Sequence, residues 1–202
     1  MKRFLLIIFI LSVLLFCSVE SYAHPDVFTK FSLTFIFNDE GLSAIKEKWV
    51  FDEAFSSILI NDYDINGNKK LDASEIQKLK DESFDGLSDY KYFTFIKIGA
   101  LKVAPVQGTN FNPSIRKNNV GYEFLLPYQI KSEKKYTEVF IDVFDPEIFI
   151  DFVYEEPPCL IENRENAPIE AEWRMVDNSN TLAFVYKKTA YNTIVLKFRR
   201  KP

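Results

Sequence analysis

The sequence predicts a mainly β protein of the α+β class, an antiparallel β-sandwich or open barrel with an inserted EF-hand-like helix–loop–helix. Two observations predict this class. Short segments rich in β-branched and aromatic residues recur along the chain, separated by Pro, Gly and Asn. One stretch, about residues 52–90, changes instead to a helical spacing of apolar residues. Residues 24–202 have a length that fits a single β-rich domain carrying this insertion.

The first 23 residues are typical of a cleavable secretory signal peptide. Lys2 and Arg3 precede an apolar run that ends at Cys17, and this run is shorter than the ~20 residues of a membrane helix. Ser21 and Ala23 occupy the small-residue positions of a cleavage site, so we expect a periplasmic or secreted protein beginning at His24 without a membrane span. A retained anchor and a lipoprotein signal at Cys17 are the alternatives.

The first structured part is predicted to be a β-hairpin. Val27 to Phe37 forms one arm, a polar turn cluster ending at Gly41 follows, and Leu42 to Phe51 returns. Six further segments carry strand signals: Tyr92–Ile98, Gly121–Leu126, Tyr136–Phe144, Ile148–Tyr154, Thr181–Lys187 and Thr193–Phe198.

The helical insertion is predicted from two apolar stripes with a polar loop between them. The first stripe places Phe55, Ile58, Leu59 and Asp62 on one helix face, and the second consists of Ile76, Leu79, Ser83 and Phe84. Asp72 and Glu75 have the spacing of a capping box, which predicts the start of the second helix.

The loop between these helices has the ligand spacing of an EF-hand, which takes oxygen ligands from positions 1, 3, 5, 7, 9 and 12. The corresponding residues are Asp64, Asn66, Asn68, the Lys70 carbonyl, Asp72 and Glu75. Lys69 stands where position 6 normally has glycine, and the two asparagines lower the negative charge of the site. We therefore predict weak Ca²⁺ binding, and a degenerate EF-hand that keeps its shape without metal stays an open alternative.

A second candidate metal site is the mature N-terminus. Cleavage after Ala23 would place the α-amine and the imidazole on the same residue, His24, and Asp26 adds an oxygen. Such nitrogen ligands suit Ni²⁺, Co²⁺, Cu²⁺ or Zn²⁺. His24 is the only histidine in the chain, so the competing interpretation is an exposed terminus without a ligand role.

The rest of the composition points away from catalysis and from nucleic acid. The chain has 25 Lys and Arg against 29 Asp and Glu with no basic cluster, so it offers no footprint for nucleic acid. One histidine and one mature cysteine leave little from which to build a nucleophile and its base, and we expect a non-enzymatic protein. Cys159 is expected to be buried, with intermolecular pairing as the alternative.

Several segments together resemble a bacterial periplasmic family of unknown function, described as a periplasmic component of an uncharacterised ABC-type transport system. The segments that carry the resemblance are Ala23–Phe28, Trp49–Ser56, the EF-like loop, Phe84–Tyr90 and Phe144–Pro146. Members are often encoded near nickel/cobalt-type permeases, so the resemblance implies an accessory or binding protein in transition-metal transport with a membrane permease as partner. This family commonly has His where the chain has Asp26. The alternative is a Ca²⁺-stabilised β-sandwich interaction module without a transition-metal role.

Overall fold

The structure is a computed structural model that describes residues 27–103, 107–147, 149–163, 168–177 and 192–201. The predicted signal peptide, both residues of the N-terminal metal site (His24 and Asp26) and the predicted strand Thr181–Lys187 lie outside the described residues. Within the described part, no helix is both long and apolar enough to cross a membrane.

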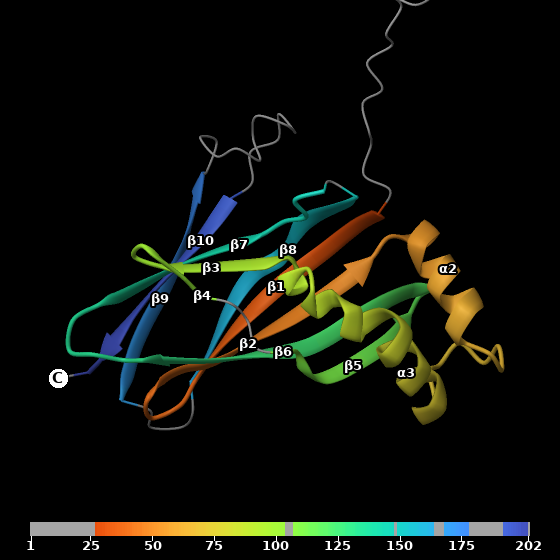
Figure 1. Cartoon of the computed structure of the whole chain (residues 1–202), viewed down its shortest axis with the longest axis horizontal. Coiled ribbons are helices and arrows are strands. Elements are labelled where there is room, and N and C mark those ends of the chain that lie inside the picture. The colour runs from red at the N-terminus through yellow and green to blue at the C-terminus, as the bar shows by residue number, and fades with distance from the viewer. Residues whose placement is uncertain (1–26, 104–106, 148, 164–167, 178–191, 202) are drawn as a thin grey trace, which may run out of the picture.

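Two five-stranded sheets form the body of the protein, which confirms the predicted sandwich-like α+β class (Figure 1). Sheet A runs in the order β5 (Thr109–Arg116), β6 (Asn119–Lys131), β2 (Gly41–Phe51), β1 (Val27–Phe37) and β8 (Ile150–Asn163). Sheet B runs in the order β4 (Leu101–Val103), β3 (Thr94–Ile98), β7 (Thr137–Val143), β10 (Asn192–Arg200) and β9 (Ile169–Asp177).

The predicted hairpin is present, and it forms the centre of sheet A. β1 and β2 pair antiparallel with Phe31 opposite Trp49, and Phe35 opposite Ile45. Sheet A is nevertheless mixed, because β8 pairs parallel with β1, starting with Val27 opposite Ile150. The expectation of a purely antiparallel architecture is corrected at this pair. A parallel partner is chosen by tertiary packing, so the alternation pattern of a single strand does not reveal it.

The core between the sheets is dominated by aromatic rings. Trp49 is 1% exposed, and its ring centroid lies 5.1 Å from that of Phe124 and 5.2 Å from that of Phe152. Phe37 of sheet A contacts Phe198 of sheet B at 5.1 Å, so the two layers are joined by direct ring contacts. Edge-to-face pairs of this kind add about 1 kcal/mol each beyond the area they bury.

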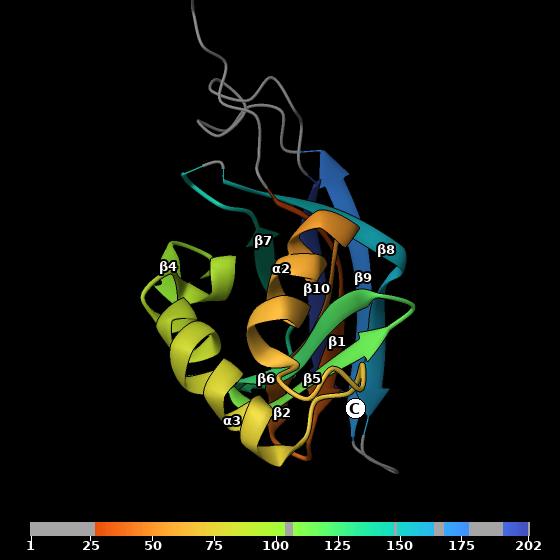
Figure 2. The same cartoon turned by 90° about the vertical axis from the view of Figure 1, so that its right-hand side faces the viewer.

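The helical insertion follows β2, as predicted. It consists of α2 (Glu53–Tyr63), α3 (Ala73–Leu79), a π-helix (Lys80–Phe84), and two short 3₁₀ segments (Asp85–Ser88 and Lys91–Phe93). Figure 2 shows α2 and α3 on the side of the sheets away from β8 and β9. Asp52 begins α2, because its Oδ1 accepts from Phe55 N–H and its Oδ2 accepts from Phe28 N–H in β1.

The buried face of α2 differs from the predicted stripe. Ile58 is 56% exposed and Asp62 is also exposed, whereas Ser56 and Leu59 are buried. Ser56 determines this orientation because its hydroxyl donates to the Phe51 carbonyl and accepts from the Val120 N–H. Hydrogen bonds to the sheet therefore decide which side of the helix is buried.

Candidate functional site

The EF-like loop is held at its first position by a buried aspartate. Asp64 ends α2 and is 7% exposed. Its Oδ1 accepts from Asn68 N–H at 3.1 Å, and its Oδ2 accepts from Lys69 N–H at 2.9 Å. These bonds curl the loop around the first carboxylate and bring the fifth and sixth positions, Asn68 and Lys69, toward it.

The last position, Glu75, closes the loop from the other side. Its side chain is 3% exposed, and its Oε2 accepts from Asp72 N–H at 2.9 Å. The Asp72 carboxylate in turn accepts from Glu75 N–H, so the predicted capping box is confirmed. Glu75 Oε1 reaches back to accept from the backbone of Ile65 and Asn66 at 2.9 and 3.3 Å. One carboxylate therefore joins the beginning of the loop to the first turn of α3.

The asparagine at the third position bridges the acidic residues. Asn66 Nδ2 lies 3.0 Å from Glu75 Oε1 and 3.4 Å from Asp72 Oδ2, while its Oδ1 accepts from Asn68 N–H. The amide donor thus lies between two carboxylates that would otherwise face a cation. Hydrogen bonds from Glu75 N–H and the Ser74 side chain hold the pKa of Asp72 below its ordinary value. Throughout the described ranges, no group of three or more His, Cys, Asp or Glu is arranged to hold a metal ion.

The sixth and seventh positions show how the loop tolerates two lysines. Lys69 has φ 60°, the left-handed backbone that glycine adopts more easily, and Gly67 also has a positive φ of 69°. Lys69 Nζ donates to Asn118 Oδ1 at 3.0 Å, which directs its charge out of the loop. Lys70 N–H donates to Asn68 Oδ1 at 2.8 Å. The predicted strain at Lys69 is therefore present in the loop as it stands.

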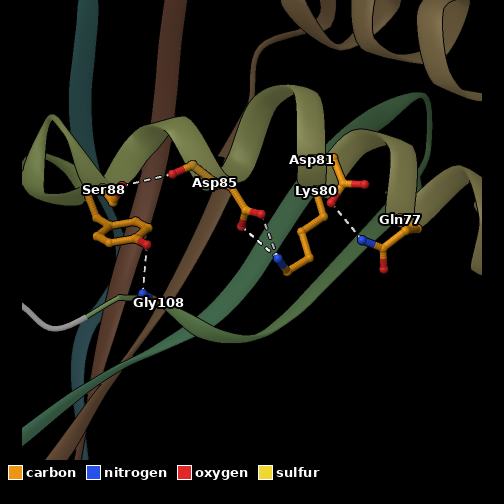
Figure 3. Close-up of polar contacts among 7 residues, drawn as sticks. Gln77, Lys80, Asp81, Asp85, Ser88 and Gly108 are labelled. Atoms are coloured by element: carbon orange, nitrogen blue, oxygen red, sulfur yellow. Dashed lines mark hydrogen bonds and ion pairs between the residues drawn. The ribbon is translucent and has the colours of Figure 1, made fainter.

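The helical segment beyond the loop carries a row of local polar contacts (Figure 3). Lys80 Nζ contacts both Asp85 carboxylate oxygens at 2.7 and 2.8 Å, and this bond raises the pKa of Lys80. Gln77 Nε2 donates to Asp81 Oδ1 at 2.7 Å, and Ser88 Oγ donates to the Asp85 carbonyl. These contacts all join residues within one or two turns, so they stabilise the segment locally.

The segment ends in a left-handed turn that the sequence did not predict. Lys91, Tyr92 and Phe93 have φ of 57°, 51° and 54°, although none is glycine. The predicted strand start at Tyr92 is wrong, because β3 begins at Thr94. Such conformations cost of order 1 kcal/mol or more per residue and persist only when surrounding contacts impose them. Here the Tyr92 hydroxyl accepts from Gly108 N–H at 2.7 Å, a bond drawn in Figure 3.

A buried carboxyl group, Glu47, lies outside the residues that sequence reasoning selected. It is 0% exposed on the core face of β2, and it accepts from Thr94 Oγ1 at 2.6 Å and Trp49 Nε1 at 2.9 Å. Burial raises its pKa from an ordinary 4.5 to about 7, and the two hydrogen bonds oppose part of that rise. The alternation of Ile45, Glu47, Trp49 and Phe51 carried the signal, since it places this carboxyl on the same face as three apolar residues.

Two other features predicted from the sequence are Cys159 and the N-terminal pair His24 and Asp26. Cys159 is 3% exposed, which confirms its predicted burial, and burial raises the pKa of its thiol to about 12. It is therefore an unreactive core residue. The N-terminal pair His24 and Asp26 lies outside the described residues, so of the two predicted metal sites only the EF-like loop has a described geometry.

Comparisons with known proteins give a consistent assignment. The chain is 34% identical over 98 residues to an uncharacterized 15.5 kDa protein in the trpE 3' region of Spirochaeta aurantia, a match covering 48% of this chain and 69% of that protein. It is 24% identical over 143 residues to an uncharacterized protein of Haemophilus influenzae, covering 69% of this chain and 67% of the relative. A family model described as "Protein of unknown function (DUF1007)" matches residues 9–188. The chain therefore belongs to the DUF1007 family, whose function is unknown.

Proposed function

We propose that the protein is a non-enzymatic interaction module of the cell envelope, in which an EF-hand-like loop binds Ca²⁺ weakly and fixes the helical insertion to the β-sandwich. The observation that carries the proposal is the position of Glu75. This twelfth-position carboxylate is 3% exposed and already turned over the loop, where it meets residues 65 and 66. A bidentate ligand at this position is the residue that closes the coordination of Ca²⁺ in an EF-hand.

The Asn66 amide sets how tightly the loop would hold the ion. Its Nδ2 donates to Glu75 and Asp72, so a cation must displace this donor and the hydrogen bonds it makes. Only three of the five side-chain ligands carry a negative charge, since Asn66 and Asn68 are neutral. Both features favour an affinity in the range of extracellular modules, about 10⁻⁴–10⁻³ M. At millimolar Ca²⁺ such a site stabilises the folded protein by mass action.

The substitution Asn66→Asp tests this proposal in two opposite directions. Without metal, the variant should be less stable than the native protein, because it replaces a donor between two carboxylates with a third negative charge. With Ca²⁺, the added charged ligand should tighten binding about tenfold or more. Thermal unfolding in EDTA and in up to 10 mM Ca²⁺, with Mg²⁺ as the competing ion, measures both effects.

A matched control is Asn61→Asp, which makes the same charge change on α2 at an exposed position outside the loop. It should leave Ca²⁺ binding unchanged. The proposal fails if Ca²⁺ raises the melting temperature of neither the native protein nor Asn66→Asp, and a degenerate EF-hand would then be the correct description.

A second candidate function is accessory binding in nickel- or cobalt-type transport, with a membrane permease as partner. The observation that favours it is the cleavage pattern, which would leave His24 with its α-amine and imidazole free together and Asp26 two residues away. Both nitrogens must lose their protons to bind Ni²⁺, Co²⁺, Cu²⁺ or Zn²⁺. The resemblance to a family described as a transport component supports the same context.

The N-terminal site is tested with protein that begins at His24. We expect weak Ni²⁺ or Cu²⁺ binding in calorimetric titrations, and this binding should fall steeply below about pH 6, as protons compete for both nitrogens. Adding one residue before His24 displaces the α-amine and should abolish binding while leaving the melting temperature unchanged. If the extended protein binds as well as the native one, the N-terminal site is wrong, whatever the outcome at the EF-like loop.

A further inference from the structure

The buried carboxyl of Glu47 shares a hydroxyl group with the left-handed turn. Thr94 Oγ1 lies 2.6 Å from Glu47 Oε1 and 3.1 Å from the carbonyl oxygen of Tyr92, the middle residue of that turn. A threonine hydroxyl has one proton but can also accept. It can therefore donate fully to one of these two oxygens at a time.

The protonation state of Glu47 decides which oxygen receives the Thr94 proton. When the carboxyl is neutral, its own O–H can donate to Thr94 Oγ1, and the threonine proton is then free to bond the Tyr92 carbonyl. When the carboxyl has released its proton to solvent, Glu47 is an acceptor only, and Thr94 must turn its proton toward it. The Tyr92 carbonyl then loses the bond from Thr94. Trp49 Nε1 donates to the other carboxyl oxygen, Oε2, in both states.

The Lys91–Phe93 turn, whose Tyr92 carbonyl gains or loses the bond from Thr94, is strained and connects the helical segment to sheet B. Lys91, Tyr92 and Phe93 all have positive φ, so the turn depends on contacts that hold it in place. Tyr92 and Phe93 are buried. Tyr90 is 50% exposed, and its ring stacks on that of Phe93 at 5.7 Å. A change in the hydrogen bonding of the turn can therefore change the position of the exposed Tyr90 ring through its contact with Phe93.

We propose that Glu47 and Thr94 form a proton-linked switch that controls the Lys91–Phe93 turn. On the acid side, the chain of donors from Glu47 through Thr94 to the Tyr92 carbonyl holds the turn. On the alkaline side, that last bond is released and the turn loosens at the junction between the helices and sheet B.

The residues around Glu47 do not titrate or titrate far from neutral pH, so Glu47 itself is the group whose protonation changes there. The neighbouring strands place Leu33 of β1 and Phe124 of β6 opposite it, and both are apolar. Tyr128 of β6 is a titratable residue close enough to interact with the charge of Glu47. Burial is the larger cause and the Glu47 charge the smaller cause that raise the pKa of the Tyr128 hydroxyl far above neutrality. Among the residues described, no Lys, Arg or His is buried in the core to compensate a charge on Glu47.

The sign of the effect on stability follows from the raised pKa. The folded protein holds the proton of Glu47 up to about pH 7, whereas the unfolded chain releases it near 4.5. Between these values the folded state binds more protons, so stability is greatest at the acid end and falls as the pH rises. The unfolding equilibrium constant should increase about tenfold per pH unit in this window from this group alone, and the contribution becomes constant above it.

The test is an NMR titration from pH 5 to 9 that follows the Glu47 side-chain carbon and the backbone amides of Tyr92, Phe93 and Thr94. In the native protein, both sets of signals should change together with a midpoint near pH 7. Glu47→Gln removes the ionisation and should abolish the change at the turn. Thr94→Val should leave the carboxyl titrating while the turn no longer responds, and Thr94→Ser, which keeps the hydroxyl, should restore the coupling.

Two results would overturn the proposal. A Glu47 carbon that titrates near its ordinary value would show that the carboxyl is charged at neutral pH. A turn that still responds in Thr94→Val would show that the hydroxyl does not transmit the change. Comparison of Thr94→Val with Thr94→Ser keeps the test decisive even if Glu47→Gln fails to fold, because neither variant changes the carboxyl.

Discussion

Glu75→Ala is expected to lower the free energy of unfolding by about 3 kcal/mol in the absence of Ca²⁺, and to abolish Ca²⁺ binding. The carboxylate accepts from three backbone N–H groups and from the Asn66 amide, and all four of these hydrogen bonds are lost together. A hydrogen bond to a charged group contributes about 1.5–3 kcal/mol, but bonds that share one carboxylate are not additive. Urea unfolding followed by the fluorescence of the buried Trp49 measures the loss.

The matched control is Glu82→Ala, which removes the same side chain from the adjacent π-helix. Glu82 is exposed, and its ion pair with Lys78 spans 4.0 Å on the surface. The change there should remain within about 0.5 kcal/mol. Equal losses in the two variants would mean that Glu75 does not organise the loop, and retained Ca²⁺ binding in Glu75→Ala would place the ion elsewhere.

Gly41→Ala is expected to destabilise sheet A by about 3 kcal/mol or more. Gly41 has φ 153° at the start of β2, and a Cβ atom there would lie 2.1 Å from the Ile130 carbonyl oxygen and 2.7 Å from the Ser132 nitrogen. Both atoms belong to the backbone of the adjacent strand and its continuation, so neither can rotate away as a side chain would. β2 and β6 must separate at this end to accommodate the methyl group.

Gly86→Ala provides the comparison, because a Cβ atom at Gly86 would meet no atom within 4 Å and its φ is not positive. Alanine restricts the unfolded chain at this helical position, so the variant should be as stable as the native protein or slightly more stable. Urea midpoints of the two variants, measured side by side, separate the steric effect from the general effect of losing a glycine. A Gly41→Ala protein of native stability would contradict the close approach of β2 and β6.

Local signals predicted the first hairpin and the capping box correctly, because both depend on residues a few positions apart. The strand β9 was missed although Ile169, Ala171, Trp173 and Met175 alternate with charged residues, a pattern that the sequence contains. β5 was missed for a different reason: it contains Pro113 and two asparagines, which have low strand propensity, and only its edge position accommodates them.

The candidate site was predictable in its spacing but not in its hydrogen bonding. The register of Asp64, Asn66, Asp72 and Glu75 can be read from the chain, since EF-hand positions are defined by sequence separation. The direction in which the Asn66 amide points depends on three neighbours at once. The link from Glu47 to Tyr92 joins β2 to residues far along the chain, so it becomes visible only when the sheets are packed together.

The parallel pairing of β1 with β8 has a consequence for the order in which the protein folds. β1 is the first strand to be synthesised, yet one of its edges stays unpaired until β8 has been made. Its side chains Phe31, Leu33 and Phe35, which are buried in the folded protein, stay uncovered until sheet B packs against sheet A. Contacts between such distant segments slow folding, and an open apolar edge invites pairing with another chain in the meantime. The nascent β1–β2 hairpin is therefore the segment most exposed to such pairing, and the addition of β8 to sheet A ends this exposure.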